Sequence, residues 1–287
     1  MESTPLTPYA RLPHTYRGLH MMSSTVDAHG RAHWLLSERI PVQGTSDPYD
    51  ATMVTADDGR VYETHLSAVQ LYCPAFDALP DGGFVLAESR STIDRQHVQV
   101  FDALGRSSWT FRMGDAIEHL IADEAGDLWV GYFDEGVYGG DPLSHPGLRR
   151  WSSTGEPLWS FRPGPGLIDM SDCLALNVDG GTAWACPYMH YPLIEVLGDG
   201  TVHVRPTSVR GVRGLAVNGE RVVFLTGNGT LEHGRITETA VEPEERGTLL
   251  ARPDGGVPDR NAVVCRGSRI YLRERKGTDW SVFDLSA

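Results

Sequence analysis

Residues 117–132 read IEHLIADEAGDLWVGY, and this stretch indicates how the whole chain folds. A short apolar run, Ile117–Ala122, leads into an Asp-x-x-Gly segment that is followed by a second run, Leu128–Phe133. Because glycine adopts the positive φ that tight turns between strands require, the pattern predicts a β-hairpin. Two further short runs, Leu148–Ser152 and Leu158–Phe161, supply a third and a fourth strand.

Residue pairs that form tight turns recur along the chain. Asp-Gly or Asn-Gly pairs, which favour tight hairpin turns, begin at Asp58, Asp81, Asp179, Asp199, Asn218, Asn228 and Asp254. The turns between the first two strands of each unit fall near Gly30, Gly82, Gly126, Gly180, Gly219 and Gly267. These turns lie roughly 47 residues apart, which is typical of propeller repeats. Long helical periodicity is nearly absent, so the sequence predicts an all-β chain of short strands.

The predicted fold is a single β-propeller, with six blades of four antiparallel strands as the favoured count. The predicted blades cover residues 22–66, 75–112, 117–161, 172–206, 213–241 and 261–285. The last blade has material for only three strands, and residues 9–17 are expected to complete it, so that no sheet edge stays open. Five or seven blades remain alternatives, because residues 243–260 fit the repeat poorly. A β-sandwich would not pair its turns at this period.

The run from Ala122 to Tyr132 resembles the repeat of sensor-type and NHL-like propellers, in which an Asp-x-x-Gly turn leads into Leu-Trp-Val-Gly. Weaker forms occur at residues 57–62 and 177–184. The resemblance implies a fold and not an activity. WD40 repeats fit less well, because Asp279-Trp280 reverses their dipeptide and no Gly-His partner recurs.

In length and strand rhythm the chain also resembles the gluconolactonase-like hydrolases. That resemblance implies an axial divalent cation held by Glu, Asn and Asp side chains. The chain lacks the characteristic Glu-Gly/Ser-Pro-x-Trp start of those enzymes, and residues 156–159 (EPLW) are only a partial echo. No catalytic residue is therefore carried over from the family.

Composition narrows the classes of partner. The formal net charge of −13 argues against nucleic acid and against an anionic membrane surface, since both attract clustered basic residues. Residues 1–17 contain no apolar run suited to a secretory signal, and no stretch is long enough to span a bilayer. We therefore expect a cytoplasmic protein. The four cysteines lack metal-finger spacing, and no histidine pattern supports a zinc site.

Propeller topology indicates where ligands bind. In a four-stranded blade the tight turns share one rim and the longer loops share the other, and binding groups concentrate on loops. We expect the longer loops to supply substrate-binding residues, and two loops to supply catalytic histidines. The expected substrate-binding residues are Arg90, Asp134, Glu135, Asp169, Tyr188, Tyr191 and Arg213. His145 and His190 are candidate general bases. The alternatives are a solvated excursion for the loop 134–145 and ordinary ion pairs for the arginines.

The starts of the first strands are expected to face the propeller axis. Glu118, Asp172 and Asn261 offer oxygen ligands suited to Ca²⁺ or Mg²⁺, and His119 is a third candidate for proton transfer. Polar side chains around ordered water are the structural alternative at these positions.

The predicted strands also lead to one expectation about the cysteines and one about the tryptophans. If Asp179-Gly180 forms a two-residue turn, Cys173 faces Cys186 across the hairpin. In a reducing compartment we expect two buried thiols there, with a disulfide only on oxidation. Trp109, Trp129, Trp159 and Trp184 fall at strand positions, so we assign them to core packing.

Two functions from different classes fit this sequence. The first is an enzyme that performs acid–base chemistry, as a hydrolase, lyase, isomerase or cyclase, on a small polar or cyclic metabolite. The second is a non-catalytic propeller that binds a protein or peptide on its loop face. The mixture of acids, histidines and arginines on the loops favours the enzyme. Substrate and oligomeric state are left open.

Overall fold

The computed structural model describes residues 2–42, 47–72, 74–163, 169–244, 247–252, 254–256, 258 and 261–287, with the backbone alone for Asn261. Contacts divide the chain into two compact units. Unit 1 combines Met1–Arg11 with Pro163–Ala287, and unit 2 is Leu12–Arg162. Helix is confined, in the described residues, to the 3₁₀ turn η1 (His14–Tyr16) and to α1 (Asp134–Val137). The all-β prediction is confirmed.

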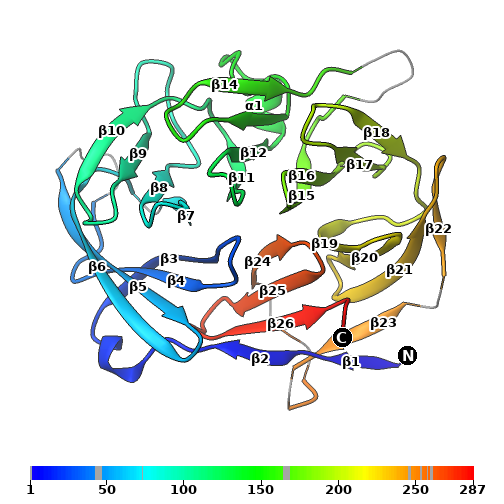
Figure 1. Ribbon diagram of the computed structural model, residues 1–287, viewed down its shortest axis with the longest axis horizontal. Helices are drawn as coiled ribbons and strands as arrows, with labels where there is room; N and C mark the ends of the chain where they lie inside the picture. The colour runs from blue at the N-terminus through cyan, green and yellow to red at the C-terminus, as the bar shows by residue number, and fades with distance from the viewer. Residues whose placement is uncertain are drawn as a thin grey trace. The chain divides into compact units, whose positions relative to one another are not determined.

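Unit 2 consists of three antiparallel sheets of four strands, each running in chain order (Figure 1). The first holds β3 (His20–Val26), β4 (Ala32–Ser37), β5 (Tyr49–Asp57) and β6 (Arg60–Val69). The second holds β7 (Ala75–Ala78), β8 (Phe84–Ala87), β9 (Val98–Phe101) and β10 (Ser107–Phe111). The third holds β11 (Ile117–Ala122), β12 (Leu128–Tyr132), β13 (Leu148–Trp151) and β14 (Pro157–Ser160). The third sheet matches the strands predicted from the sequence within one residue.

The Asp-x-x-Gly segments form the tight turns as predicted. The Asp123 carboxylate accepts hydrogen bonds from the backbone N–H groups of Ala125 and Asp127, at 3.0 and 2.9 Å, and Gly126 has a φ of 90°. Its second oxygen accepts from Trp129 Nε1 on the next strand at 3.2 Å. The short side chain of Asp123 therefore accepts the backbone N–H groups of the turn and also holds the buried Trp129 of the hairpin in place.

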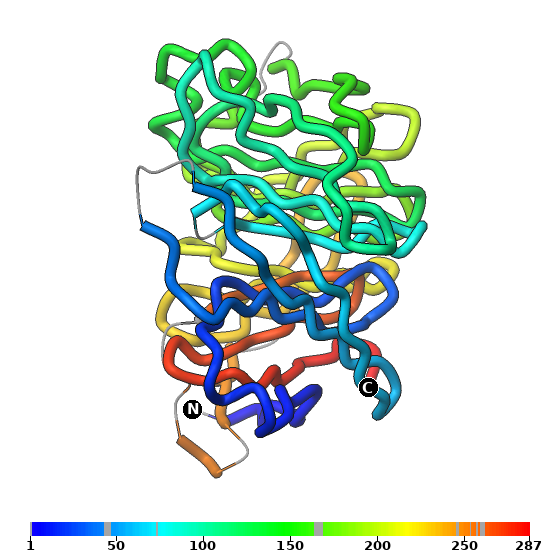
Figure 2. The backbone as a smooth tube through the Cα atoms, turned by 90° about the vertical axis from the view of Figure 1, so that its left-hand side faces the viewer, coloured from blue at the N-terminus to red at the C-terminus, as the bar shows by residue number. Residues whose placement is uncertain are grey.

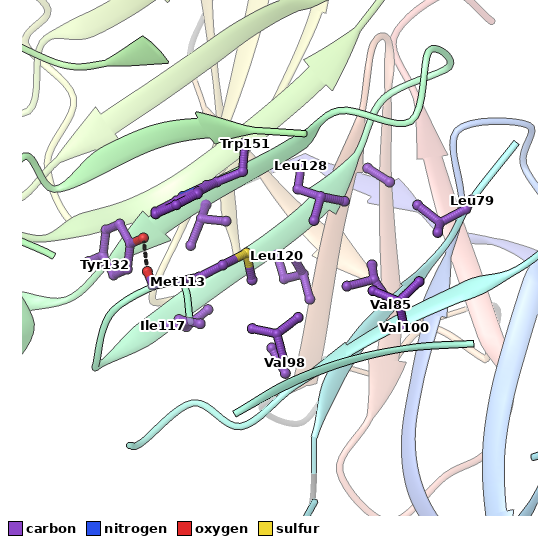
Figure 3. Close-up of a cluster of buried hydrophobic side chains, with 13 residues drawn as sticks. Leu79, Val85, Val98, Val100, Met113, Ile117, Leu120, Leu128, Tyr132 and Trp151 are labelled. Atoms are coloured by element: carbon purple, nitrogen blue, oxygen red, sulfur yellow. Dashed lines mark hydrogen bonds between the residues drawn. The ribbon is translucent and has the colours of Figure 1, made fainter. Parts of the chain in front are cut away.

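The first strands of neighbouring sheets lie together in unit 2. β3 contacts β7, and β7 contacts β11. A hydrophobic cluster fills the space between the second and third sheets, with Val98, Leu128 and Trp151 among its buried members (Figure 3). Burial of such side chains stabilises the unit by about 25 cal/mol per Å² of apolar surface.

Unit 1 is built from the later strands together with two N-terminal ones. One antiparallel run is β15 (Cys173–Asp179), β16 (Thr182–Pro187), β17 (Leu193–Val196) and β18 (Val202–Arg205). The next is β19 (Val212–Asn218), β20 (Arg221–Thr226) and β21 (Thr230–Ile236), and β21 pairs with both β22 (Val241–Pro243) and β23 (Thr248–Ala251). The last is β24 (Asn261–Arg266), β25 (Arg269–Glu274), β26 (Trp280–Asp284) and β2 (Thr7–Ala10).

The N-terminal segment completes the last sheet, as predicted, but its strand begins earlier and shares only Tyr9 and Ala10 with the predicted range. β2 pairs antiparallel with β26, whereas residues 9–17 were the predicted strand and η1 occupies part of that range. β1 (Ser3–Pro5) also pairs in parallel with β23, within the region that fitted the repeat poorly. Figures 1 and 2 both show the blue N-terminal segment beside the red β26.

The three first strands of unit 1 contact one another. β15, β19 and β24 all touch, and a buried asparagine holds them together. Asn177 Nδ2 donates to the carbonyl oxygens of Leu215 and Gly267, both at 2.8 Å, and its Oδ1 accepts from Gly267 N at 2.7 Å. These strands are therefore fixed to one another near their tight-turn ends.

The predicted register of the β15–β16 hairpin is wrong. Gly180 and Gly181 are the turn residues, so Asp179 pairs with Thr182, and Cys186 lies opposite Ala175. Two consecutive glycines take the positive φ that was assigned to Asp179 and Gly180. Cys173, Cys186 and Cys265 are buried, and none of the three forms a disulfide within the described residues; Cys73 lies outside those residues.

The tryptophan assignment holds only in part. Trp129 is fully buried, Trp159 and Trp184 are half-buried, and Trp109 is 40% exposed. Trp109 lies on the outermost strand of its sheet, where it donates a hydrogen bond from Nε1 to the Ser153 carbonyl at 3.2 Å. An outer strand has a neighbour on one side only, which the sequence pattern did not reveal.

Candidate functional site

The predicted site residues fall into one group in each unit. Unit 2 holds Arg90, Glu118, His119, Asp134, Glu135 and His145, and unit 1 holds Asp169, Asp172, Tyr188, His190, Tyr191, Arg213 and Asn261. The three predicted metal ligands, Glu118, Asp172 and Asn261, are divided between the units, and the Asn261 side chain lies outside the described residues. Their convergence stays a prediction.

In unit 1 the loop between β16 and β17 is tied to the start of β15. Tyr188 N donates a hydrogen bond to the Asp172 carbonyl at 2.9 Å. Asp172 and Arg213 stand at the starts of β15 and β19, two strands that contact each other and β24, which begins at Asn261. The backbone therefore gathers the loop ends of three first strands and one aromatic loop in a single unit.

The loop Tyr188–Tyr191 has an unusual backbone. His190 and Tyr191 have φ values of 60° and 52°, in the left-handed region that non-glycine residues rarely adopt. Each such residue costs about 1–2 kcal/mol, so surrounding contacts have to hold it. The Tyr191 ring is partly buried against the core of its unit, and its centroid lies 5.8 Å from that of Tyr188. The result is an exposed imidazole at His190.

A buried thiol supports the same loop from below. Cys186 Sγ donates to the Tyr191 carbonyl at 3.6 Å. Burial raises the pKa of the Cys186 thiol to about 12, although the positive charge of Arg210 acts in the opposite direction. The thiol therefore stays protonated at neutral pH and has a packing role instead of a nucleophilic one.

Arg210 is a residue of this site that the sequence interpretation missed. Its Cζ lies 5.7 Å from the centroid of the Tyr191 ring, and its Nη1 donates to the carbonyls of Thr207 and Val209, both at 2.8 Å. The predicted loop residue of this connection was Arg213. The sequence Thr207-Ser-Val-Arg210 carries a signal, because a Thr turn followed by an arginine three residues later can bond to its own loop.

Arg213 sits on a β-bulge. Register shifts between Val212 and Gly214 leave Arg213 as the extra residue opposite β20, and its side chain is exposed without an ion-pair partner among the described residues. The same irregularity occurs at Glu118, between Ile117 and His119 of β11, and Glu118 is also exposed. Bulges redirect side chains and are common beside active sites. In each unit, therefore, one bulge presents a predicted functional residue.

Asp169 lies just before β15. Its carbonyl accepts from Ser171 N at 2.9 Å, and the buried Ser171 Oγ has no hydrogen-bond partner within the part of the chain that the structure describes. Residues 164–168, which precede Asp169, are outside the described ranges.

The unit 2 group is arranged differently. The Arg90 guanidinium forms an ion pair with Glu135 and lies 4.3 Å from the centroid of the Phe133 ring. The alternative considered for the arginines, an ordinary ion pair, thus applies to Arg90. Arg90 and Glu135 are therefore less suited to bind a charged ligand, because the charge of each is already paired with that of the other.

Asp134 and His145 bond within their own loop. The Asp134 carboxylate accepts from Glu135 N at 2.8 Å, and His145 Nε2 lies 3.0 Å from the Gly139 carbonyl oxygen. His119 is half-buried on β11. These contacts are those of a structured loop.

A buried polar network under this loop was not anticipated. Asp141 pairs with Arg112 at 2.5 Å, and Ser144 Oγ accepts from Asp115 N and donates to Asp115 O, both at 2.7 Å. His97 is fully buried nearby. Burial lowers the pKa of His97, and the charge of Arg112 acts in the same direction. The bond to the Arg95 carbonyl and the carboxylates of Asp115 and Asp141 partly offset this shift. The network orders the loop end of unit 2, and its residues are too far apart in sequence to form a motif.

Within the described ranges, no group of three or more His, Cys, Asp or Glu side chains is placed to hold a metal ion. None of the helices in those ranges is long and apolar enough to cross a membrane.

Comparison with known proteins identifies the fold. No protein-family model matches the chain, and no curated protein matches it either. Virginiamycin B lyase from Staphylococcus aureus matches with a TM-score of 0.52 and 10% identity, over 96% of this chain and 98% of that one. Regucalcin from Agrobacterium tumefaciens, described as a calcium-binding protein, matches with a TM-score of 0.51 and 14% identity, over 99% and 95%. Hsv2 from Kluyveromyces lactis matches with a TM-score of 0.54 and 8% identity, over 93% and 74%.

These solved structures are β-propellers, and the fold of this chain is a β-propeller. The chain spans only 32% of PorZ from Porphyromonas gingivalis, at a TM-score of 0.44. At such identities the similarity concerns the fold and carries no activity. The count of six blades stays a prediction.

Proposed function

We propose that this β-propeller binds a small polar or cyclic metabolite at the loop end of unit 1 and performs acid–base chemistry on it. The observation that supports the proposal is the strained backbone at His190 and Tyr191, with φ values of 60° and 52°. Strain of this kind clusters at ligand sites, because the surroundings have to be built to maintain it. The same loop carries the exposed His190 and the neighbouring rings of Tyr188 and Tyr191, and Tyr188 N bonds it to Asp172, just before β15.

The roles of the residues follow from their chemistry. His190 carries protons, since one nitrogen of an imidazole can accept a proton while the other donates one. Tyr188 and Tyr191 form a wall against which a ring can pack, and Arg213, redirected by its bulge, neutralises negative charge that develops during reaction. Hydrolysis, elimination, isomerisation and cyclisation all use these roles. One similar propeller is named a lyase, so a β-propeller that catalyses a reaction of this kind has a precedent.

A divalent cation is an optional part of the proposal. Glu118, Asp172 and Asn261 would supply oxygen ligands to Ca²⁺ or Mg²⁺. The exposed Glu118 on its bulge has no ion-pair partner among the described residues, which suits a ligand. Regucalcin, another similar propeller, is described as calcium-binding. A bound cation would polarise an oxygen of the substrate.

Protein binding is the second candidate, and one observation favours it. Six of the large hydrophobic side chains exposed in the described residues lie on loops between the second and third strands of successive sheets. These are Ile40, Val42, Ile93, Tyr138, Tyr188 and Met189. Exposed apolar side chains on one class of loop are typical of surfaces that contact proteins.

A thermal-melting screen of the full chain against polar metabolites, Ca²⁺, Mg²⁺ and EDTA tests the proposal. A ligand present at a hundred times its dissociation constant should add about 2.7 kcal/mol to the free energy of unfolding. Tyr188→Ala should abolish the shift, whereas Tyr62→Ala, an exposed tyrosine at the tight-turn end of β6, should retain it. The proposal fails if no metabolite moves the transition, or if both variants respond alike.

The catalytic role of His190 and the binding of a divalent cation are tested by separate measurements. Any metabolite that binds is incubated with the protein and followed by NMR, and His190→Gln should stop its conversion while binding persists. His29→Gln, an exposed histidine at a tight turn, is the matched control. If EDTA leaves the melting temperature of wild type and of Asp172→Ala unchanged, the cation is removed from the proposal.

A further inference from the structure

Arg210 is held in a fixed orientation by its own loop. Thr207 Oγ1 accepts from Val209 N at 3.0 Å, which shapes the turn, and Arg210 Nη1 donates to the carbonyls of Thr207 and Val209 at 2.8 Å. The guanidinium carbon lies 5.7 Å from the centroid of the Tyr191 ring. A guanidinium that is already immobilised loses little entropy when it binds a ligand.

The bonds already formed determine which donors are left. A guanidinium has five N–H groups, and the two on Nη1 are used by the loop carbonyls. Nε–H and the two N–H groups of Nη2 have no hydrogen-bond or ion-pair partner among the described residues. Nε–H and one Nη2–H point the same way along one edge of the plane. That edge matches the two oxygens of a carboxylate, which it binds through two parallel hydrogen bonds.

Apolar and aromatic side chains lie in the loop that Arg210 contacts. The centroid of the Tyr191 ring is 5.7 Å from the Arg210 guanidinium carbon and 5.8 Å from the centroid of the Tyr188 ring. Tyr188 is 55% exposed and Met189 is 43% exposed, so this loop offers exposed apolar surface to a ligand. The chain as a whole carries a charge of −13, and an anion approaching it needs such a local cation.

We infer that Arg210 binds the carboxylate of a ring-bearing acid whose ring packs against Tyr188. The inference rests on the proposed function and narrows its metabolite to a cyclic or aromatic carboxylate. A phosphoryl group can also accept two parallel hydrogen bonds from this edge, but Arg210 offers no further parallel donor for its third oxygen, so we commit to a carboxylate.

Isothermal titration of the full chain with benzoate, benzamide and phenyl phosphate tests the charge and the ring separately. Benzoate and benzamide have the same ring and nearly the same shape, but only benzoate carries the anion. Wild type should bind benzoate at least tenfold more tightly than benzamide, and more tightly than phenyl phosphate. Equal affinities for benzoate and benzamide, or tighter binding of phenyl phosphate, would overturn the inference.

Two variants locate the site. Arg210→Lys keeps the charge and removes the paired donors, so the benzoate-to-benzamide preference should fall at least tenfold, while Arg221→Lys, on an exposed arginine of β20, should preserve it. Tyr188→Ala should weaken both probes. Because Arg210 also holds its loop, the quantity compared is the ratio of the benzoate and benzamide affinities and not either affinity alone. If Arg210→Lys weakens the binding of both probes equally, the inference is contradicted.

The outcomes separate this inference from the proposed function. If a neutral metabolite from the melting screen binds through Tyr188 while carboxylates do not bind, the carboxylate assignment is wrong and the metabolite site stands. If neither the probes nor the metabolites bind, both are wrong.

Discussion

Asp27 shows how a single carboxylate can hold one hairpin of unit 2. It is buried at the β3–β4 turn, accepts from the backbone N–H groups of His29 and Arg31 at 2.9 and 2.8 Å, and bonds to the side chains of Arg31 and His33. Burial alone would raise the pKa of Asp27, but the bonds to His33 and Arg31 outweigh it and hold the pKa well below its usual value. His33 Nδ1 in turn bonds to Thr55 Oγ1 at 2.8 Å.

The pH dependence follows from the sign of this shift. A carboxylate whose pKa is lower in the folded state stabilises the fold above its unfolded pKa of about 3.9, and that contribution is lost as the pH falls. We expect Asp27→Asn to lower the free energy of unfolding by about 3–5 kcal/mol at pH 7, with a difference from wild type that shrinks as the pH falls below about 4. Urea unfolding at several pH values measures both. The exposed Asp57→Asn is the control, and a difference independent of pH would contradict the explanation.

At the scale of one element, the loop between β12 and β13 depends on a glycine that the sequence does not single out. A Cβ built on Gly136 would lie 2.6 Å from the Asp115 carbonyl oxygen and 2.7 Å from Ala116 Cβ, so this buried residue has no room for a side chain. Gly140, four residues later in the same loop, has nothing within 4 Å of the corresponding position.

The two glycines form a matched test. Gly136→Ala should push the loop away from residues 115–116 and cost about 1–3 kcal/mol. Gly140→Ala should change the free energy of unfolding by less than about 0.5 kcal/mol. Denaturant titration of both variants gives the comparison, and similar values for the two would show that the loop adjusts freely.

At the scale of the whole molecule, unit 1 joins the two ends of the chain. Met1–Arg11 belongs with Pro163–Ala287, β2 pairs with β26, and Leu6 is buried in the cluster around Leu250 and Phe283. The last sheet therefore cannot be completed by the C-terminal residues alone, and the stability of unit 1 depends on a segment far away in sequence.

Leu6→Ala should accordingly cost about 2–5 kcal/mol, as expected for a buried leucine. Thr7→Ala, an exposed neighbour on β2, should have little effect. Deleting residues 2–10 should lower the melting temperature further than either substitution. If the deletion melts at the wild-type temperature, the N-terminal strand contributes nothing to closure.

Local chemistry was sufficient to predict most of the fold. The turn signals and short apolar runs determined the all-β class, and the strands of residues 117–161 agree with the prediction within one residue. Turn residues act on their nearest neighbours, so their effect is visible in the sequence. The register prediction failed at this hairpin because Asp179, Gly180 and Gly181 are successive candidate turn residues. A turn at Asp179-Gly180 and one at Gly180-Gly181 give different strand pairings.

The candidate site was predictable only in part, for the same physical reason. The sequence alone singled out Tyr188, His190 and Tyr191, since an aromatic loop between prolines is a local pattern. Only the tertiary structure could reveal Arg210 over Tyr191, the Arg90–Glu135 pair, or the buried Asp141 and His97 network. Strand propensity and turns depend on residues that are adjacent in the chain. A binding site depends on which distant loops the sheets bring together, and that is decided by packing.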